Sequence, residues 1–276
     1  MQVAVTILVE NTTPMPNLIG EYGFACLVAV DDCQILFDTG SSTAIFNNSR
    51  ELGINLERIP EVFISHGHYD HTGGLLQLLK QYGPKKVYGH PRFLLPKLLP
   101  LRQGGFKPIG TPASREELLQ AGAQLIAVDR FTAIHPGVYI SGEIPRTNDF
   151  EDTGGNFQVE IDGDIREDRL DDDMAMIINH PRGLIIISGC AHAGMINTID
   201  YAVQMTGVKQ IQAYIGGTHL MTASADRLTQ TVKSLKENRP EKVIVAHCTG
   251  FYAGARLYND LGETVIKGET GMTFKF

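Results

Sequence analysis

The chain has 276 residues, enough for one large domain or two small ones. Its hydrophobic (43%) and charged (20%) fractions are those of a globular protein rather than a disordered one. It has 24 basic and 31 acidic residues, a formal charge of −7, and no tryptophan, which makes it a poor candidate for binding nucleic acid. No apolar stretch approaches the roughly 20 residues of a membrane helix. The opening MQVAVTILVEN lacks the basic region of a signal peptide, and the four cysteines form no CxxC pair. We therefore expect a cytoplasmic protein with no membrane or nucleic-acid partner.

The first part of the chain predicts strands joined by tight turns, followed by alternating helices and strands. β-Branched and apolar runs indicate strands at residues 3–10, 24–30, 34–40, 61–65 and 85–90. Apolar residues at helical spacing indicate helices at residues 44–53 and 73–83, each ended by a glycine.

Residues from about 91 to 170 are less regular. They contain several prolines and the glycine-rich stretch TGGNF, which indicate a loop-rich insertion rather than an independent domain. We expect this insertion to form a lid that controls substrate choice rather than catalysis, because loops on a rigid scaffold usually carry specificity.

Regular patterns return after the insertion. Residues 174–180 and 183–189 predict a hairpin, and further strands are expected at 211–217 and 242–248. Helices are expected at 194–205 and 223–238, followed by a short helix–strand pair at the end of the chain. We find no internal repeat. Strands followed by helices in two successive sets favour a layered α/β sandwich.

One stretch, ISHGHYDHTGG at residues 64–74, places four polar groups at the end of an apolar strand: His66, His68, Asp70 and His71. The alternate positions 66 and 68 project to the same side of an extended segment, and Asp70 and His71 can point into the same cavity. Imidazole and carboxylate are the ligands of catalytic zinc, and an unliganded cluster would be costly to bury. A solvated, histidine-rich turn is the alternative, but each residue type in HxHxDH has a coordination role.

This stretch resembles the mark of the metallo-β-lactamase superfamily, HxHxDH after a strand. FDTG (37–40), SGCAHAG (188–194) and VAHCTG (245–250) look like further motifs of that superfamily. More narrowly, LVEN, SHGHYDHTGGL, GEIPRT, GCAHAGMIN, IGGTHL and HCTG are similar to the subfamily named for dihydropterin-ribofuranosyl-aminobenzene-phosphate synthase. The resemblance covers nearly the whole chain. It implies a four-layer αββα sandwich, formed by residues 1–276 as one domain, with the site at one edge between the sheets.

The resemblance also implies the metal ligands. His66, His68 and His192 would hold a first divalent ion, and Asp70, His71 and His247 would hold a second. The pattern of the chain agrees, because His192 and His247 each follow a strongly apolar strand, although a buried histidine with no metal is the alternative for each. The metal is expected to be zinc, as one or two ions, with manganese or iron as alternatives.

At one position the chain departs from the superfamily pattern. Many members bridge their metals with an aspartate, whereas the strand at 211–217 is followed by Thr218 and His219. Imidazole bridges metals less readily than carboxylate, so we expect His219 to serve one metal or the substrate. With Asp70, it is the residue that we expect to act in catalysis.

Asp38, in FDTG, can accept the ring N–H of a ligand histidine and so fix its tautomer; a turn-forming Asp-Thr-Gly is the alternative. Tyr69 and His90 are candidates for substrate binding.

Other polar residues near the motifs are expected to have simpler roles. His135 and His180 are expected in loops or on the surface, and Cys190 and Cys248 are expected to pack rather than ligate. The acidic run Asp171–Asp173 is interpreted as a solvated turn, unless one member caps or orients a pocket group.

The chain lacks GxSxG, a P-loop, GxGxxG and HExxH, so it shows no serine nucleophile and no phosphate loop. The superfamily implies hydrolysis by metal-bound hydroxide. The predicted ligand set holds only one carboxylate, which favours a phosphorylated or otherwise anionic small molecule as the substrate. The subfamily instead implies a transferase that displaces pyrophosphate from a dihydropterin. A metal-containing binding or sensory protein without turnover is a third hypothesis.

Overall fold

The computed structural model describes residues 1–276, which divide into two compact units. The first unit comprises Met1–Val128, Asn156–Asp172 and Glu269–Phe276, and the second comprises Asp129–Gly155 and Asp173–Gly268. None of the helices is long and apolar enough to span a membrane.

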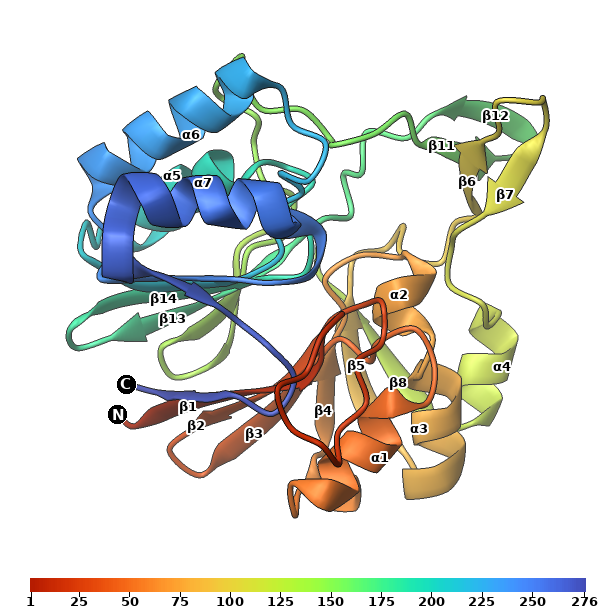
Figure 1. Cartoon of the computed structure of the whole chain (residues 1–276). Helices are drawn as coiled ribbons and strands as arrows, with labels where there is room; N and C mark the ends of the chain where they lie inside the picture. Colours follow the sequence, from red (N-terminus) through yellow and green to blue (C-terminus); the bar gives the residue numbers. More distant parts are fainter. The chain divides into compact units, whose positions relative to one another are not determined.

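The first unit contains a seven-stranded sheet with the order β18-β1-β2-β3-β4-β5-β8. Its strands are β1 (Val3–Val9), β2 (Ala25–Val30), β3 (Cys33–Phe37), β4 (Glu61–Phe63), β5 (Lys85–Gly89), β8 (Ala123–Ala127) and β18 (Thr273–Lys275). The strands β3, β4, β5 and β8 are parallel, whereas β1 pairs antiparallel with β2 and β18. Because β1 and β18 are neighbours, the two ends of the chain lie side by side (Figure 1).

Helices of the first unit pack on this sheet through one apolar face. They are α1 (Ala44–Glu51), α3 (Leu75–Tyr82) and α4 (Arg115–Gln120), with the short α2 (Tyr69–Thr72) and a 3-10 turn η1 (Leu56–Arg58). Ile45, Leu78 and Leu118 bring the three longer helices into one buried cluster with Leu36 and Val62 of the sheet. Within α3, the buried residues Leu75, Leu78 and Leu79 have the helical spacing that the sequence shows.

A second, four-stranded antiparallel sheet in the first unit has the order β12-β11-β6-β7. It consists of β6 (Lys97–Pro100), β7 (Phe106–Pro108), β11 (Gln158–Ile161) and β12 (Asp164–Glu167). Two hairpins that are distant in sequence form it through the pairing of β6 with β11.

The second unit contains a seven-stranded sheet with the order β17-β16-β15-β14-β13-β10-β9. Its strands are β9 (Thr132–His135), β10 (Val138–Ile140), β13 (Ala175–His180), β14 (Gly183–Ser188), β15 (Ile211–Gly216), β16 (Lys242–Val245) and β17 (Val265–Lys267). The helices are α5 (Met195–Thr206), α6 (Ala225–Asn238) and α7 (Phe251–Leu261), with 3-10 turns η2 (His247–Thr249) and η3 (Gly262–Thr264). Ile199, Leu235 and Leu257 join the three helices to Ile186 and Tyr214 of the sheet in one buried cluster.

Each strand and helix predicted outside residues 91–170 is present, and β18 is one strand more than the chain's end was expected to contain. The segment 91–170 is more regular than its prolines suggested, because it contains seven strands and α4. Pro100 and Pro108 lie at the ends of β6 and β7, where the missing backbone N–H is tolerated. The strand β8 extends the large sheet of the first unit, and β9 and β10 extend that of the second.

Candidate metal centre

In the first unit, the HxHxDH residues follow β4 and form a buried cluster. His66 Nε2 lies 3.0 Å from His68 Nδ1, and the rings of His66 and His71 have centroids 4.2 Å apart. Asp70 Oδ2 lies 3.8 Å from His71 Nε2. All four side chains are buried. Here the chain contributes three imidazoles and one carboxylate within reach of one another, from an extended segment and the first turn of α2.

Asp38 follows the neighbouring parallel strand, β3, and contacts this cluster. Its Oδ2 accepts from His71 Nδ1 and Ser65 Oγ, and its Oδ1 accepts from Ser65 N, each at 2.7 Å. Burial raises the pKa of the Asp38 carboxyl, and the nearby His71 opposes that rise. Because the carboxylate accepts from Nδ1–H, the His71 tautomer carries its lone pair on Nε2, the atom that faces Asp70.

His68 is held in the neutral form. Burial, reinforced by the positive charge of Lys97, lowers the pKa of the His68 imidazole to about 3. Its ring also packs against Phe157, with centroids 5.1 Å apart. A neutral imidazole is the form that binds a metal, so this histidine is ready to act as a ligand at neutral pH.

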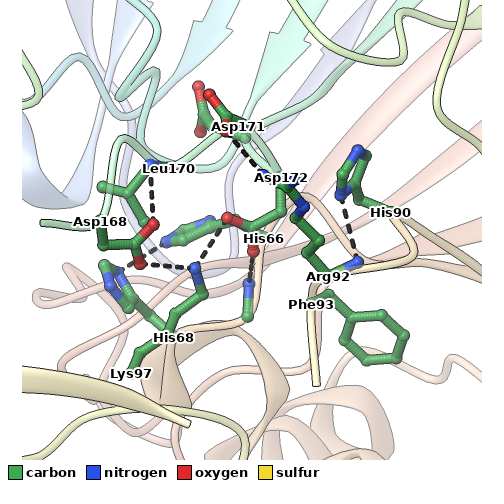
Figure 2. Close-up of polar contacts among 12 residues, drawn as sticks. His66, His68, His90, Arg92, Phe93, Lys97, Asp168, Leu170, Asp171 and Asp172 are labelled. Atoms are coloured by element: carbon green, nitrogen blue, oxygen red, sulfur yellow. Dashed lines mark hydrogen bonds and ion pairs between the residues drawn. The ribbon is translucent and has the colours of Figure 1, made fainter. Parts of the chain in front are cut away.

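The acidic run after β12 is not a solvated turn throughout, so that interpretation was wrong. Asp172 and Asp173 are buried, while Asp171 is half-buried and pairs with Arg92. Asp172 Oδ2 accepts from the backbone N–H of Gly67, between His66 and His68, at 2.8 Å (Figure 2). The alternative reading, in which one member of the run orients the site, therefore fits Asp172.

In the second unit, His192, His219 and His247 follow the neighbouring parallel strands β14, β15 and β16. The His192 and His219 rings have centroids 4.3 Å apart. The donor atoms of Cys190, His192 and His219 lie within 4.8 Å of one another, and so do those of Cys190, His247 and Cys248. This unit therefore gathers imidazole and thiol donors at one edge of its sheet.

Backbone strain accompanies these strand ends. Positive φ angles occur at Asp38 (56°), Ala191 (53°), His219 (48°) and His247 (51°). Residues other than glycine rarely adopt this region, and such conformations are commonly found at functional sites.

A loop before Gly155 holds His192 in place. The His192 Nδ1 donates to the carbonyl of Thr153 at 2.7 Å, and Arg146 Nη1 donates to the His192 carbonyl at 3.0 Å. Glu151 of this loop accepts from the backbone N–H groups of Ile196 and Asn197, in the first turn of α5. Sequence reasoning assigned this loop to substrate choice and missed its contacts with a predicted ligand. The only signal for them was the GEIPRT motif, which contains Arg146.

Cys248 has backbone partners in the second unit: its Sγ donates to the Cys190 carbonyl at 3.6 Å and accepts from His219 N at 3.3 Å. Both cysteines are buried. These contacts tie the loops after β14, β15 and β16 to one another.

Of the remaining predicted residues, Tyr69 begins α2, His90 follows β5, and His135 and His180 end strands. Tyr69 is half-buried, with Lys107 Nζ 6.0 Å from its ring centroid. His90 is buried and accepts from Arg92 N at 3.2 Å. The loop or surface assignment was wrong for His180, which is buried at the end of β13, whereas His135 is half-buried at the end of the edge strand β9.

Comparison with known proteins is decisive about the family. Residues 18–247 match the model of the metallo-beta-lactamase superfamily. The chain belongs to this superfamily. The predicted metallo-β-lactamase fold is thereby confirmed, and membership of the superfamily implies divalent-metal binding.

Three relatives match this superfamily member over nearly their whole lengths. The 7,8-dihydropterin-6-methyl-4-(β-D-ribofuranosyl)-aminobenzene-5′-phosphate synthase of Methanocaldococcus jannaschii is 30% identical over 268 residues, 93% of this chain and 90% of the relative. Protein MJ0448 of the same organism is 30% identical over 254 residues, 92% and 93% of the two chains. The solved structure of Tm1679, a metal-dependent hydrolase of the β-lactamase superfamily, is 29% identical with a TM-score of 0.87, covering 99% and 98% of the two chains. The predicted resemblance to the synthase subfamily is thus confirmed.

Proposed function

We propose that this chain is a metal-dependent hydrolase acting on a phosphorylated or otherwise anionic small molecule, with zinc as the metal. The observation that carries the proposal is the buried HxHxDH cluster, in which His68 is neutral and Asp38 fixes the His71 tautomer. A hydrogen bond to the ring nitrogen that does not bind the metal is the usual means of orienting a metal-binding histidine. The proposed ligands are His66, His68 and His192 for one ion and Asp70, His71 and His247 for another.

The donor chemistry of each unit fits a divalent ion such as zinc. The first unit offers imidazole nitrogens and a carboxylate, and the second offers imidazole nitrogens with thiols nearby. A bound divalent ion would lower the pKa of a coordinated water and polarise an oxygen of the substrate. Asp38 would keep a proton on His71 Nδ1, and the Thr153 carbonyl would keep one on His192 Nδ1. His219 would serve one metal or the substrate.

The charge of the ligand set supports an anionic substrate. The seven proposed ligands, His219 included, contain one carboxylate, Asp70, whereas two divalent ions bring a charge of +4. A phosphate or carboxylate of the substrate would offset part of this excess, because unscreened like charges a few ångströms apart repel strongly in a partly dry site. Tyr69 and His90 are proposed to contact the substrate, and the four-stranded sheet is proposed as the part of residues 91–170 that selects it.

A transferase is the second candidate, favoured by the 30% identity over 93% of this chain to the dihydropterin-ribofuranosyl-aminobenzene-phosphate synthase. The proposed ligands serve either reaction, since both need an anionic oxygen to be stabilised. Product analysis separates the two. A transferase releases pyrophosphate only when both a pyrophosphorylated dihydropterin and the ribosylated aminobenzene phosphate are present, whereas a hydrolase needs only water.

The test of the proposal begins with metal analysis of the purified protein. We expect tightly bound zinc in the parent and its loss in the double variant His66→Ala/His68→Ala, with the far-ultraviolet circular dichroism of the parent retained. Turnover of phosphomonoesters and phosphodiesters should disappear in the same variant. Unchanged metal content in the variant would contradict the ligand assignment. Metal binding without turnover of any anionic ester or of the synthase substrates would instead favour a binding or sensory protein.

A further inference from the structure

Gly67, between the proposed ligands His66 and His68, is in close contact with Asp172, Thr111 and Phe93. The Gly67 N–H donates to Asp172 Oδ2 at 2.8 Å, and Thr111 Oγ1 donates to the Gly67 carbonyl at 3.4 Å. A Cβ at position 67 would collide with the carbonyl oxygen of Phe93, so only glycine fits there. Because this peptide joins His66 to His68, its orientation sets the directions of both rings.

Asp172 is in turn held by a buried ion network. Lys97 Nζ donates to Asp172 Oδ1 at 2.7 Å and to Asp168 Oδ2 at 2.8 Å (Figure 2). Lys97 and Asp172 are at most 2% exposed, and Asp168 is 7% exposed. Asp168 Oδ1 also accepts from Leu170 N at 2.9 Å, closing the turn that delivers Asp172.

The charged forms of Lys97 and Asp172 are favoured despite their burial. Burial alone would favour the neutral forms, but the two carboxylates raise the pKa of Lys97, and Lys97 lowers the pKa of Asp172. Two carboxylates facing one ammonium leave one net negative charge beside the histidine cluster. Such a buried network adds little to stability for its cost in desolvation, so its location calls for another explanation.

The network also connects the four-stranded sheet to the cluster. Lys97 begins β6, and the Lys97 carbonyl accepts from Ile109 N at 2.8 Å, while the Ile109 carbonyl accepts from Tyr69 N at 2.9 Å. Lys97 is thus connected to both neighbours of His68. Its side chain contacts Gly67 through Asp172, and its carbonyl contacts Tyr69 through Ile109. A change in the position of β6 would be passed to the HxH peptide.

We propose that Asp172, held by Lys97 and Asp168, is a positioning residue that fixes the Gly67 peptide and so tunes the metal affinity of His66 and His68. This inference rests on the proposed function, since it assumes that the two histidines bind metal. Asp172 need not touch the metal or the substrate. It acts by holding two ligands at one spacing and by placing a negative charge one contact away from them.

The test compares zinc affinity and folding in four variants. We expect Asp172→Ala to weaken zinc binding by about 10–100-fold, the usual effect of removing an outer contact of a metal site. Asp172→Asn should weaken it less, because its carbonyl oxygen can still accept from Gly67 N–H. Lys97→Met should also weaken it. The matched control is Lys85→Met: Lys85 is a buried lysine of the same unit, 3% exposed, and its Nζ donates to the carbonyls of Leu56 and Ile59.

Affinity is measured by competition with a chromophoric chelator, and folding of the metal-free proteins by thermal unfolding. The visible spectrum of the cobalt(II)-substituted protein should shift in Asp172→Asn and stay unchanged in Lys85→Met. Parent-like affinity in Asp172→Ala, or an equal loss in Lys97→Met and Lys85→Met, would overturn the inference and leave the proposed function standing. A parent protein that binds no zinc would overturn both.

Discussion

Asp38→Asn is the most direct perturbation of the way in which His71 is oriented. Asp38 is fully buried and accepts three hydrogen bonds of 2.7 Å, two from Ser65 and one from His71. Asparagine has the same shape and tolerates the φ of 56° at this position better than most residues. The substitution therefore changes charge and hydrogen bonding while leaving the backbone as it is.

The expected magnitude follows from the partners of Asp38. An asparagine has one acceptor oxygen, and its NH2 group only donates, so it cannot serve Ser65 N and His71 Nδ1–H together. If the oxygen keeps Ser65 N, His71 must move its proton to Nε2, and its lone pair no longer faces Asp70. One charge-assisted hydrogen bond, worth about 1.5–3 kcal/mol, is lost. Part of that loss is offset, because burial raises the pKa of Asp38 and the charge was costly to bury.

We therefore expect Asp38→Asn to lower the free energy of unfolding of the metal-free protein by about 1 kcal/mol. Its zinc affinity should fall by about 10–100-fold. Urea unfolding gives the first quantity and chelator competition the second. Lys85→Met is the control, since Lys85 is buried in the same unit and its Nζ donates to the carbonyls of Leu56 and Ile59. Equal zinc affinity in Asp38→Asn and the parent, or an equal loss in Lys85→Met, would refute the tautomer argument.

Three further predictions concern charge, pH and substrate choice. Zinc titration without phosphate should show one tight and one weak site, and phosphate should strengthen the weak one; two equally tight sites in anion-free buffer would contradict the charge argument. Burial raises the pKa of Glu151 above its ordinary 4.5, so the folded state binds this proton more tightly than the unfolded state does. The contribution of Glu151 to the free energy of unfolding should therefore rise as pH falls from 7 toward 4.5, so the parent should gain stability relative to Glu151→Gln over that range; equal slopes of the two proteins in urea unfolding would argue against this. Phe106, 44% exposed on β7, is on the proposed selecting sheet, so Phe106→Ser should raise KM and leave kcat and zinc content unchanged. A fall in kcat alone would count against that role.

Sequence reasoning succeeded where the chemistry is local. The HxHxDH residues lie within six positions, so the geometry of one strand end and one helical turn brings them together. Asp38 was expected to contact a ligand histidine because it ends a strand next to that motif, and β3 does pair with β4. The parallel strands of the two seven-stranded sheets could be predicted from the sequence because their residues are apolar without interruption.

The positioning contacts were missed because their partners are distant in sequence. Asp172 lies 75 residues from Lys97 and 105 residues from Gly67. Three consecutive aspartates also have the composition of a solvated turn, and nothing local shows that the second one faces a lysine. Residues 91–170 were predicted to be loop-rich because they contain several prolines. Pro100 and Pro108, however, lie at the ends of strands of a small sheet and do not interrupt them.

The placement of these carboxylates bears on how the chain balances the charge of its metals. Asp38 and Asp172 would sit one hydrogen bond away from the proposed ligands, Asp38 on the His71 ring and Asp172 on the Gly67 peptide. Both supply negative charge, and neither would occupy a coordination position. A bridging aspartate would neutralise more charge but would also fill a place on both ions. If His219 stands in place of such an aspartate, as we propose, these carboxylates would balance part of the charge from outside the ligand set and would leave coordination positions and residual positive charge for an anionic substrate.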